Sequence, residues 1–103
     1  ERIIVDGDHH PIGYWVGKEK VSFTNTIIPV NGPTNVFMFT DGLVDQFGGE
    51  KGKKLKYSKF YELLFSVRDL SSKQQKEAIS QFTKEWMGSQ EQIDDITVAG
   101  VKF

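Results

Sequence analysis

The sequence NVFMFTDGLVD at residues 35–45 decides the fold, because an apolar strand there stops abruptly at a carboxylate followed by glycine. Apolar side chains alternate onto both faces of this strand, so we expect both faces to be at least partly buried. Gly42 has no Cβ, which lets the backbone pass close to whatever Asp41 holds. Asp45 follows four residues later, one turn away if a short helix begins there. The stretch therefore predicts a strand that fixes a carboxylate firmly at its end.

A second acidic pair, Asp94 and Asp95, opens the last apolar run, at residues 96–101. Two strands that are far apart in the sequence thus each carry a carboxylate at one end. Carboxylate oxygens are the ligands that hard cations such as Mg²⁺ and Mn²⁺ prefer. The pattern indicates a metal site, and the alternative for each aspartate is that it caps a turn or a helix.

Strand and helix signals occupy different parts of the chain. Before residue 35, β-type sequences predict three further strands, at residues 2–5, 13–18 and 21–30. After residue 57, apolar spacing predicts helices at residues 58–68 and 72–87. Antiparallel strands followed by grouped helices and one final strand favour an α+β domain.

The two helices carry end signals and buried stripes. Ser58 is the expected N-cap of the first helix, and Ser72 with Gln75 fits a capping box for the second. Gly88 stands where a C-cap glycine is expected. The predicted core positions are Phe60, Leu63, Leu64 and Val67 in the first helix and Ala78, Ile79, Phe82 and Trp86 in the second.

Composition excludes several classes of function. The net charge of −1 gives no reason to expect nucleic acid or an anionic membrane as a partner. The absence of cysteine excludes disulfides and zinc–thiolate sites, and fits a reducing compartment. No apolar run approaches the roughly 18–20 residues that span a bilayer, so we expect no direct membrane contact by this segment. The chain of 103 residues starts at Glu1 and runs straight into an apolar strand, which suggests a piece of a longer protein.

A glycine-rich basic loop lies between the acidic strand end and the first helix. Its spacing does not fit a Walker phosphate loop, because three residues separate Gly48 from Gly52 and Lys54 replaces the hydroxyl residue. One hypothesis is that its lysines, above all Lys53 and Lys54, attract a phosphorylated, anionic partner. The alternative, which we favour, is a flexible solvated loop beside the site.

The acidic motifs resemble those of a known family. The sequence TDGLVD at residues 40–45, followed by DDIT at residues 94–97, resembles the C-terminal half of the metal-dependent serine/threonine phosphatases of type 2C. The resemblance is to the bacterial SpoIIE-like branch, whose two C-terminal signatures are TDG-x-x-(E/D) and DD-x-T. The sequence HPIG at residues 10–13 resembles the Pro-Ile-Gly segment that precedes the TDG strand in that branch.

The resemblance implies a fold and a metal site. The fold would be part of an α-β-β-α sandwich, with two Mn²⁺ or Mg²⁺ ions at one end of its sheets in the complete domain. Asp41 would be a metal ligand that bridges to the second ion, and Asp94 would be another ligand. Asp95 stands where relatives carry Asp or Asn, and Asp45 matches an acidic position linked in some relatives to a third ion. The backbone of Gly42 would lie near the metal, and metal-activated water would attack without any further catalytic residue.

The resemblance also implies a function. Residues 1–103 would be the C-terminal part of one SpoIIE-like domain that hydrolyses phosphoserine or phosphothreonine on a protein, such as an anti-anti-sigma-type regulator. That domain would be the cytoplasmic output domain of a bacterial signalling protein. This location also fits the cytoplasmic part of a membrane-anchored sensor. The family's N-terminal Gly-Asp motif would lie before this chain, so the piece alone is expected to be inactive or nearly so. The alternatives are a non-catalytic interaction module with the same fold, and a generic α+β domain whose aspartates only form turns.

Overall fold

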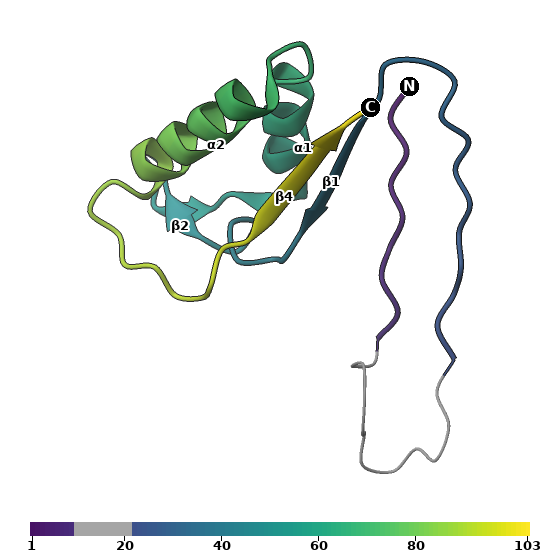
Figure 1. Ribbon diagram of the computed structural model, residues 1–103. Helices are drawn as coiled ribbons and strands as arrows, with labels where there is room; N and C mark the ends of the chain where they lie inside the picture. Colours follow the sequence, from purple (N-terminus) through teal and green to yellow (C-terminus); the bar gives the residue numbers. More distant parts are fainter. Residues whose placement is uncertain (10–21) are drawn as a thin grey trace. The chain divides into compact units, whose positions relative to one another are not determined.

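The computed structural model describes residues 1–9 and 22–103, and the chain divides into two units, Glu1–Val30 and Asn31–Phe103 (Figure 1). In the described part of the first unit the chain is extended, and Thr24 is tied to Asp8. The Thr24 amide and hydroxyl donate to the two Asp8 carboxylate oxygens at 2.6 and 3.0 Å. These two hydrogen bonds link the beginning and the end of the unit.

The strands predicted in the first unit are not formed where the structure describes it. Residues 2–5 and 22–30 are neither strand nor helix, so the strand predictions for 2–5 and for the described part of 21–30 are wrong. All of these residues are exposed, and Ile27 is 93% exposed. A strand gains its stability from a paired neighbour and a covered apolar face, and alternation in the sequence supplies neither. The segment at 10–13 and the strand at 13–18 lie outside the described residues.

The second unit contains six elements in an α+β arrangement. Strand β1 (Asn35–Phe39) is followed by the short strands β2 (Phe47–Gly48) and β3 (Lys53–Lys54). Helices α1 (Lys56–Ser66) and α2 (Ser72–Met87) come next, and β4 (Val98–Lys102) ends the order. The strands form two antiparallel pairs, β1 with β4 and β2 with β3. The predicted α+β class, with two helices before a final strand, is confirmed.

Strands β1 and β4 pair so that the end of one lies beside the start of the other. Phe39 is opposite Val98, and the Thr40 amide continues the ladder to the Thr97 carbonyl at 3.0 Å. Both helices lie on one side of this sheet (Figure 1), where Phe37 and Phe39 pack against the core. On the other face Met38 is 64% exposed, so the prediction that both faces are covered is wrong for this unit. The unit has helices for one face only.

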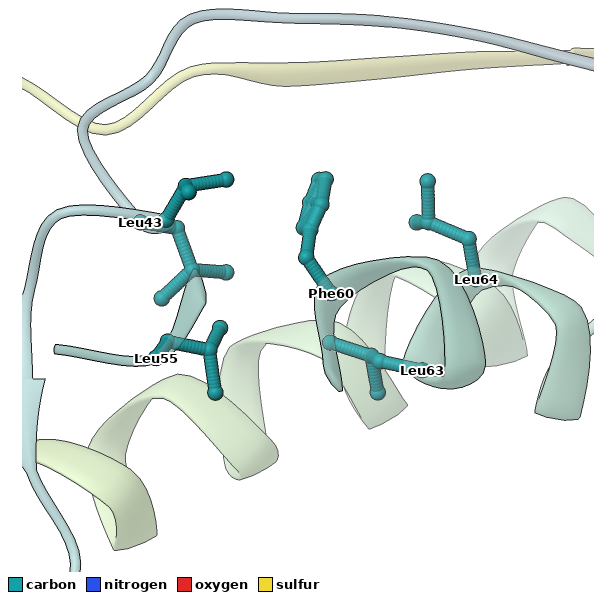
Figure 2. Close-up of a cluster of buried hydrophobic side chains, with 6 residues drawn as sticks. Leu43, Leu55, Phe60, Leu63 and Leu64 are labelled. Atoms are coloured by element: carbon teal, nitrogen blue, oxygen red, sulfur yellow. The ribbon is translucent and has the colours of Figure 1, made fainter. Parts of the chain in front are cut away.

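The hydrophobic core forms between the turn after β1 and helix α1. Figure 2 shows Phe60 between Leu43 and Leu64, and the Phe60 ring lies 4.6 Å from the ring of Phe39, centre to centre. All four positions predicted for the stripe of the first helix are buried. Complete burial of one large apolar side chain contributes about 1.5–3 kcal/mol. The buried apolar residues are Leu43, Val44, Leu55, Phe60, Leu63, Leu64 and Val67.

Helix α1 begins two residues before the predicted position. Its N-cap is Leu55, without a side-chain cap, and the predicted N-cap Ser58 lies inside the helix. The amides of Leu55 and Lys56 donate to the carbonyls of Gln46 and Val44, at 3.1 and 2.9 Å. These tertiary hydrogen bonds satisfy the amide of the N-cap residue and the first of the free amides at the start of the helix. Lys56 adopts a φ of 72°, a left-handed conformation that is unfavourable for a side chain other than glycine.

Helix α2 has the predicted bounds but a capping box one residue earlier. The Gln74 amide donates to the Ser71 hydroxyl, and the Ser71 amide donates to the Gln74 side chain. Gln75 is instead buried, and its amide group donates to the Asn35 side chain and to the Val67 carbonyl. Gly88 is the C-cap as predicted, with φ of 52°. On the predicted stripe, Ala78 is partly buried, and the other three members, Ile79, Phe82 and Trp86, pack against the core.

The glycine-rich loop is a hairpin whose Gly48 and Gly49 pack on the end of α2, while most of its other residues are exposed, as expected of a solvated loop. The Gly49 amide donates to the Trp86 carbonyl at 2.9 Å. A Cβ on Gly48 would overlap that same carbonyl oxygen, so only glycine allows this approach. Lys53 and Lys54 are exposed on the hairpin. Within residues 1–9 and 22–103, none of the helices has the length and hydrophobicity needed to cross a membrane.

Candidate functional site

The first acidic segment is a tight turn that follows β1. Residues 41–45 form this turn, and the Asp45 amide donates to the Asp41 carbonyl at 2.9 Å, one helical turn apart. Leu43 and Val44 are buried beneath it, with 0% and 3% exposure, while Asp41 is exposed and Asp45 is half-buried. The apolar pair anchors the turn in the core, and the two aspartates therefore remain at its surface.

The second acidic segment is the loop between α2 and β4. Asp94 and Asp95 are both exposed there. One carboxylate oxygen of Asp94 accepts the Asp95 amide at 2.7 Å, and the Asp94 carbonyl accepts the Gln92 side-chain amide at 3.0 Å. The Asp94 carboxylate thus contacts the adjacent main chain. An ionised carboxylate has about four acceptor positions, so this bond leaves Asp94 able to bind a cation as well.

A backbone contact at Gly42 brings the two acidic segments together. A Cβ on Gly42 would overlap the Asp95 carbonyl oxygen and would lie 3.2 Å from the Ile96 Cα, so the two main chains pass at a distance only glycine permits. Thr40 supports this contact, since its hydroxyl lies 3.4 Å from the Asp95 carbonyl and accepts the Thr97 amide at 3.2 Å. The residues next to Asp41 and those next to Asp94 therefore meet at one end of the β1–β4 sheet.

Asp45 faces the basic hairpin. The Lys54 ammonium lies 3.8 Å from the Asp45 carboxylate, and both side chains are roughly half exposed. A pair exposed to this extent contributes at most about 1 kcal/mol to stability. The Lys54 ammonium also lies 5.9 Å from the centre of the Phe47 ring. A cationic group thus lies directly beside the acidic turn.

A groove on this unit lies away from the four aspartates. It has a volume of about 650 Å³ and lies between α2 and the sheet, where its walls include Phe37, Ile79 and Val98. Asp41, Asp45, Asp94 and Asp95 do not line it. The candidate site is an exposed acidic surface at the sheet end.

Comparison with known proteins gives a match to a solved structure. No protein-family model matches the chain, and no curated protein matches it. A solved structure, the SiaA-PP2C domain of Pseudomonas aeruginosa, is 32% identical over 67% of this chain, with a TM-score of 0.65. The chain is similar to part of a PP2C domain. It spans 28% of the length of that solved chain.

This similarity supports the sequence resemblance at the level of the type 2C phosphatases. The α+β fold, the two helices and the final strand are what a PP2C fragment contains. The match does not distinguish the SpoIIE-like branch, which stays a prediction. PP2C enzymes generally depend on Mg²⁺ or Mn²⁺. The relevant properties of the aspartates are therefore the type and the number of the ligands that they offer.

The donors have the right chemistry for a PP2C metal site but are too few. Carboxylate and water oxygens are what Mg²⁺ and Mn²⁺ bind. Within residues 1–9 and 22–103, however, no group of three or more Asp, Glu, His or Cys side chains is placed to hold a metal ion. The described residues therefore do not form a metal site by themselves. The roles predicted for Asp41, Asp94, Asp95 and Asp45 remain predictions that the geometry makes reasonable.

Sequence reasoning missed one residue at this site, Gln46. It follows Asp45 directly and is completely buried. Hydrophobic patterns predict which apolar side chains are buried, and they do not predict a buried glutamine. Its side-chain nitrogen donates to the Glu91 carbonyl at 2.8 Å, across to the loop that carries the second acidic pair. The only sequence signal is its position between the acidic turn and the Phe-Gly-Gly segment.

Proposed function

We propose that this chain is the C-terminal part of a PP2C-type phosphatase domain that removes phosphate from serine or threonine of a protein, with Mn²⁺ or Mg²⁺ as cofactor. The observation that carries the proposal is the Gly42–Asp95 contact, which brings the TDG turn and the DD-x-T loop to one sheet end. The 32% identity to a PP2C domain is the reason to interpret this contact as part of a phosphatase metal site. Antiparallel pairing of β1 and β4 alone would bring the two segments together, so the proposal depends on the PP2C similarity as well as on the contact.

The proposed roles of the residues follow from their positions. Asp41 and Asp94 are proposed as metal ligands, and Asp95 and Asp45 as weaker or supporting ones, with the Gly42 backbone beside the ion. When bound, divalent ions neutralise phosphoryl charge and lower the pKa of a bound water. The chain's own residues hold carboxylates at fixed positions for this purpose. Lys53 and Lys54 are proposed to attract the phosphorylated partner, since Lys54 lies beside Asp45.

The wider setting is proposed from the sequence resemblance. The SpoIIE-like branch implies a cytoplasmic output domain of a bacterial signalling protein, with sensor domains elsewhere in the same protein. It also implies a phosphorylated regulator of the anti-anti-sigma type as substrate. The remaining metal ligands would come from the part of the domain that this chain does not include. The competing proposal is a non-catalytic interaction module that keeps the fold.

The decisive experiment replaces Asp41 in the protein that contains the complete domain. We expect Asp41→Ala to lower Mn²⁺-dependent hydrolysis of a phosphoserine peptide by at least about 100-fold, since a metal site contributes several kcal/mol of charge stabilisation. Asp69→Ala is the matched control, because Asp69 is an exposed aspartate in the turn between the helices. Unchanged hydrolysis in Asp41→Ala would contradict the proposal. A wild-type domain that binds Mn²⁺ without hydrolysis would favour the interaction module.

A further inference from the structure

Gln46 is a polar side chain in an apolar environment that connects the two acidic segments. Its exposure is 0%. The side-chain nitrogen donates to the carbonyls of Glu91 and Phe47, at 2.8 and 3.0 Å. The main-chain carbonyl of Gln46 accepts the Trp86 indole N–H at 2.9 Å and the Leu55 amide at 3.1 Å. One residue thus contacts the hairpin, the end of α2 and the acidic loop.

The bond to Glu91 reaches the acidic loop shortly before the pair Asp94–Asp95. Ile93 is 56% exposed, so burial of an apolar side chain does not anchor the middle of this loop. The bond from the Gln92 side chain to the Asp94 carbonyl lies within the loop and does not tie it to the rest of the unit. Gln46 ties the loop to the rest of the unit through its bond to Glu91, and it directly follows the turn that carries Asp41 and Asp45.

Gln46 is also a poor choice for stability alone. Its side-chain oxygen is buried and has no hydrogen-bond partner among the described residues. Such an unsatisfied acceptor costs about 1–3 kcal/mol, which an apolar side chain of similar size would avoid. A residue that retains this cost and holds a particular loop is better explained by what it positions.

We propose that Gln46 is a positioning residue for the metal site, and this inference rests on the proposed function. By holding the main chain at Glu91, it adds a second tie to this loop, beside the contact of Thr40 with Asp95, and so helps to fix where Asp94 lies relative to Asp41. Outer partners of metal ligands typically affect metal affinity by 10–100-fold when they are removed. Gln46 would act on the metal through the loop and would not touch it.

The chain contains a matched control in Gln75. This second glutamine is 4% exposed, and its side-chain nitrogen also donates two hydrogen bonds, to the Asn35 side chain at 2.8 Å and to the Val67 carbonyl at 3.0 Å. Asn35 is at the start of β1, whereas Asp41 follows its end. Gln75→Met therefore removes an equivalent buried amide far from the acidic sheet end.

The experiment compares wild type, Gln46→Met and Gln75→Met by NMR of the protein that contains the complete domain, with Mn²⁺ alone as the probe. In wild type, Mn²⁺ should broaden the amide signals of Asp41, Asp94 and Asp95 over the same concentration range. In Gln46→Met, the concentration that half-broadens Asp94 and Asp95 should rise about tenfold. The order parameters of residues 91–95 should fall from about 0.85 toward 0.6. Gln75→Met should leave both quantities at their wild-type values.

Each result separates this inference from the proposed function. If the broadening seen in wild type is unchanged in Gln46→Met, the positioning role is overturned. The proposed metal ligands are not affected by that result. Equal effects of Gln46→Met and Gln75→Met also overturn it, because they would reflect stability alone. No broadening in wild type, at any Mn²⁺ concentration that leaves distant amides sharp, contradicts the proposed ligands and the inference with them. If Gln46→Met does not fold, Gln46→Asn replaces it, since the shorter side chain cannot reach Glu91.

Discussion

Gly42 has no room for a side chain, because a Cβ there would overlap the carbonyl oxygen of Asp95. We expect Gly42→Ala to lower the free energy of unfolding by about 1–3 kcal/mol, the usual cost of overpacking. The cost should appear in urea denaturation followed by circular dichroism. The added methyl group should also push the two acidic segments apart.

Gly7→Ala is the control for this substitution. A Cβ on Gly7 would meet no atom within 4 Å, so its free energy of unfolding should stay within about 0.5 kcal/mol of wild type. If Gly42→Ala were as harmless as Gly7→Ala, the close approach of the two main chains would be refuted.

Individual residues show where sequence reasoning reaches its limit. Asp41 and Asp94 stand out in the sequence because each carboxylate interrupts an apolar run, and the structure places their neighbours side by side. Gln46 and Lys56 do not stand out. The bonds of a buried amide and a left-handed φ are both consequences of tertiary contacts, and no local pattern encodes them.

The start of α2 distinguishes two capping boxes that the sequence makes equally good. Ser71 with Gln74 and Ser72 with Gln75 both have the required spacing, and the structure uses the first. We expect Ser71→Ala to lower the free energy of unfolding by about 1 kcal/mol, because it removes the side-chain acceptor at the N-cap. Ser72→Ala should change it by less than about 0.5 kcal/mol. Urea denaturation of the two variants measures this, and the reverse order would support the register expected from the sequence.

At the level of elements, periodicity predicted the features that repeat along a helix, such as a buried stripe. It missed the features that depend on a single tertiary contact. The stripe of α1 and the span of α2 follow from apolar residues at helical spacing, and both are confirmed. The capping box of α2 depends on Gln75, whose side chain is buried against β1. Gln75 is therefore not available to cap the helix, and Gln74 pairs with Ser71 instead. The predicted strands at residues 2–5 and 21–30 failed for a related reason, since a strand depends on its neighbour.

On the scale of the whole molecule, every buried apolar side chain of the described residues lies within Asn31–Phe103. We therefore expect residues 31–103 to fold by themselves, with a free energy of unfolding within about 0.5 kcal/mol of that of the 103-residue chain. Equilibrium unfolding in urea, with both chains at equal concentration, measures this difference. A loss of more than about 1 kcal/mol, or an unfolded product, would show that residues 1–30 contribute to the core.

The fold class followed from the sequence at this scale because strands and helices occupy separate parts of the chain. The convergence of the acidic motifs followed from the family resemblance and from antiparallel pairing, which places the end of β1 beside the start of β4. The open face of the sheet did not follow. Apolar side chains on both faces are typical of a sheet that is covered on both sides, whereas the unit Asn31–Phe103 holds helices for one face only (Figure 1).

The pairing of Phe39 with Val98 also sets an order for events on the ribosome. The turn after β1 and both helices emerge while β4 is still being made, so the local helical core can form first. The β1–β4 ladder, by contrast, waits for the segment Val98–Lys102 to leave the exit tunnel. Until then Asp41 has no acidic loop beside it. The candidate metal centre is therefore the last part of this unit to be completed during translation.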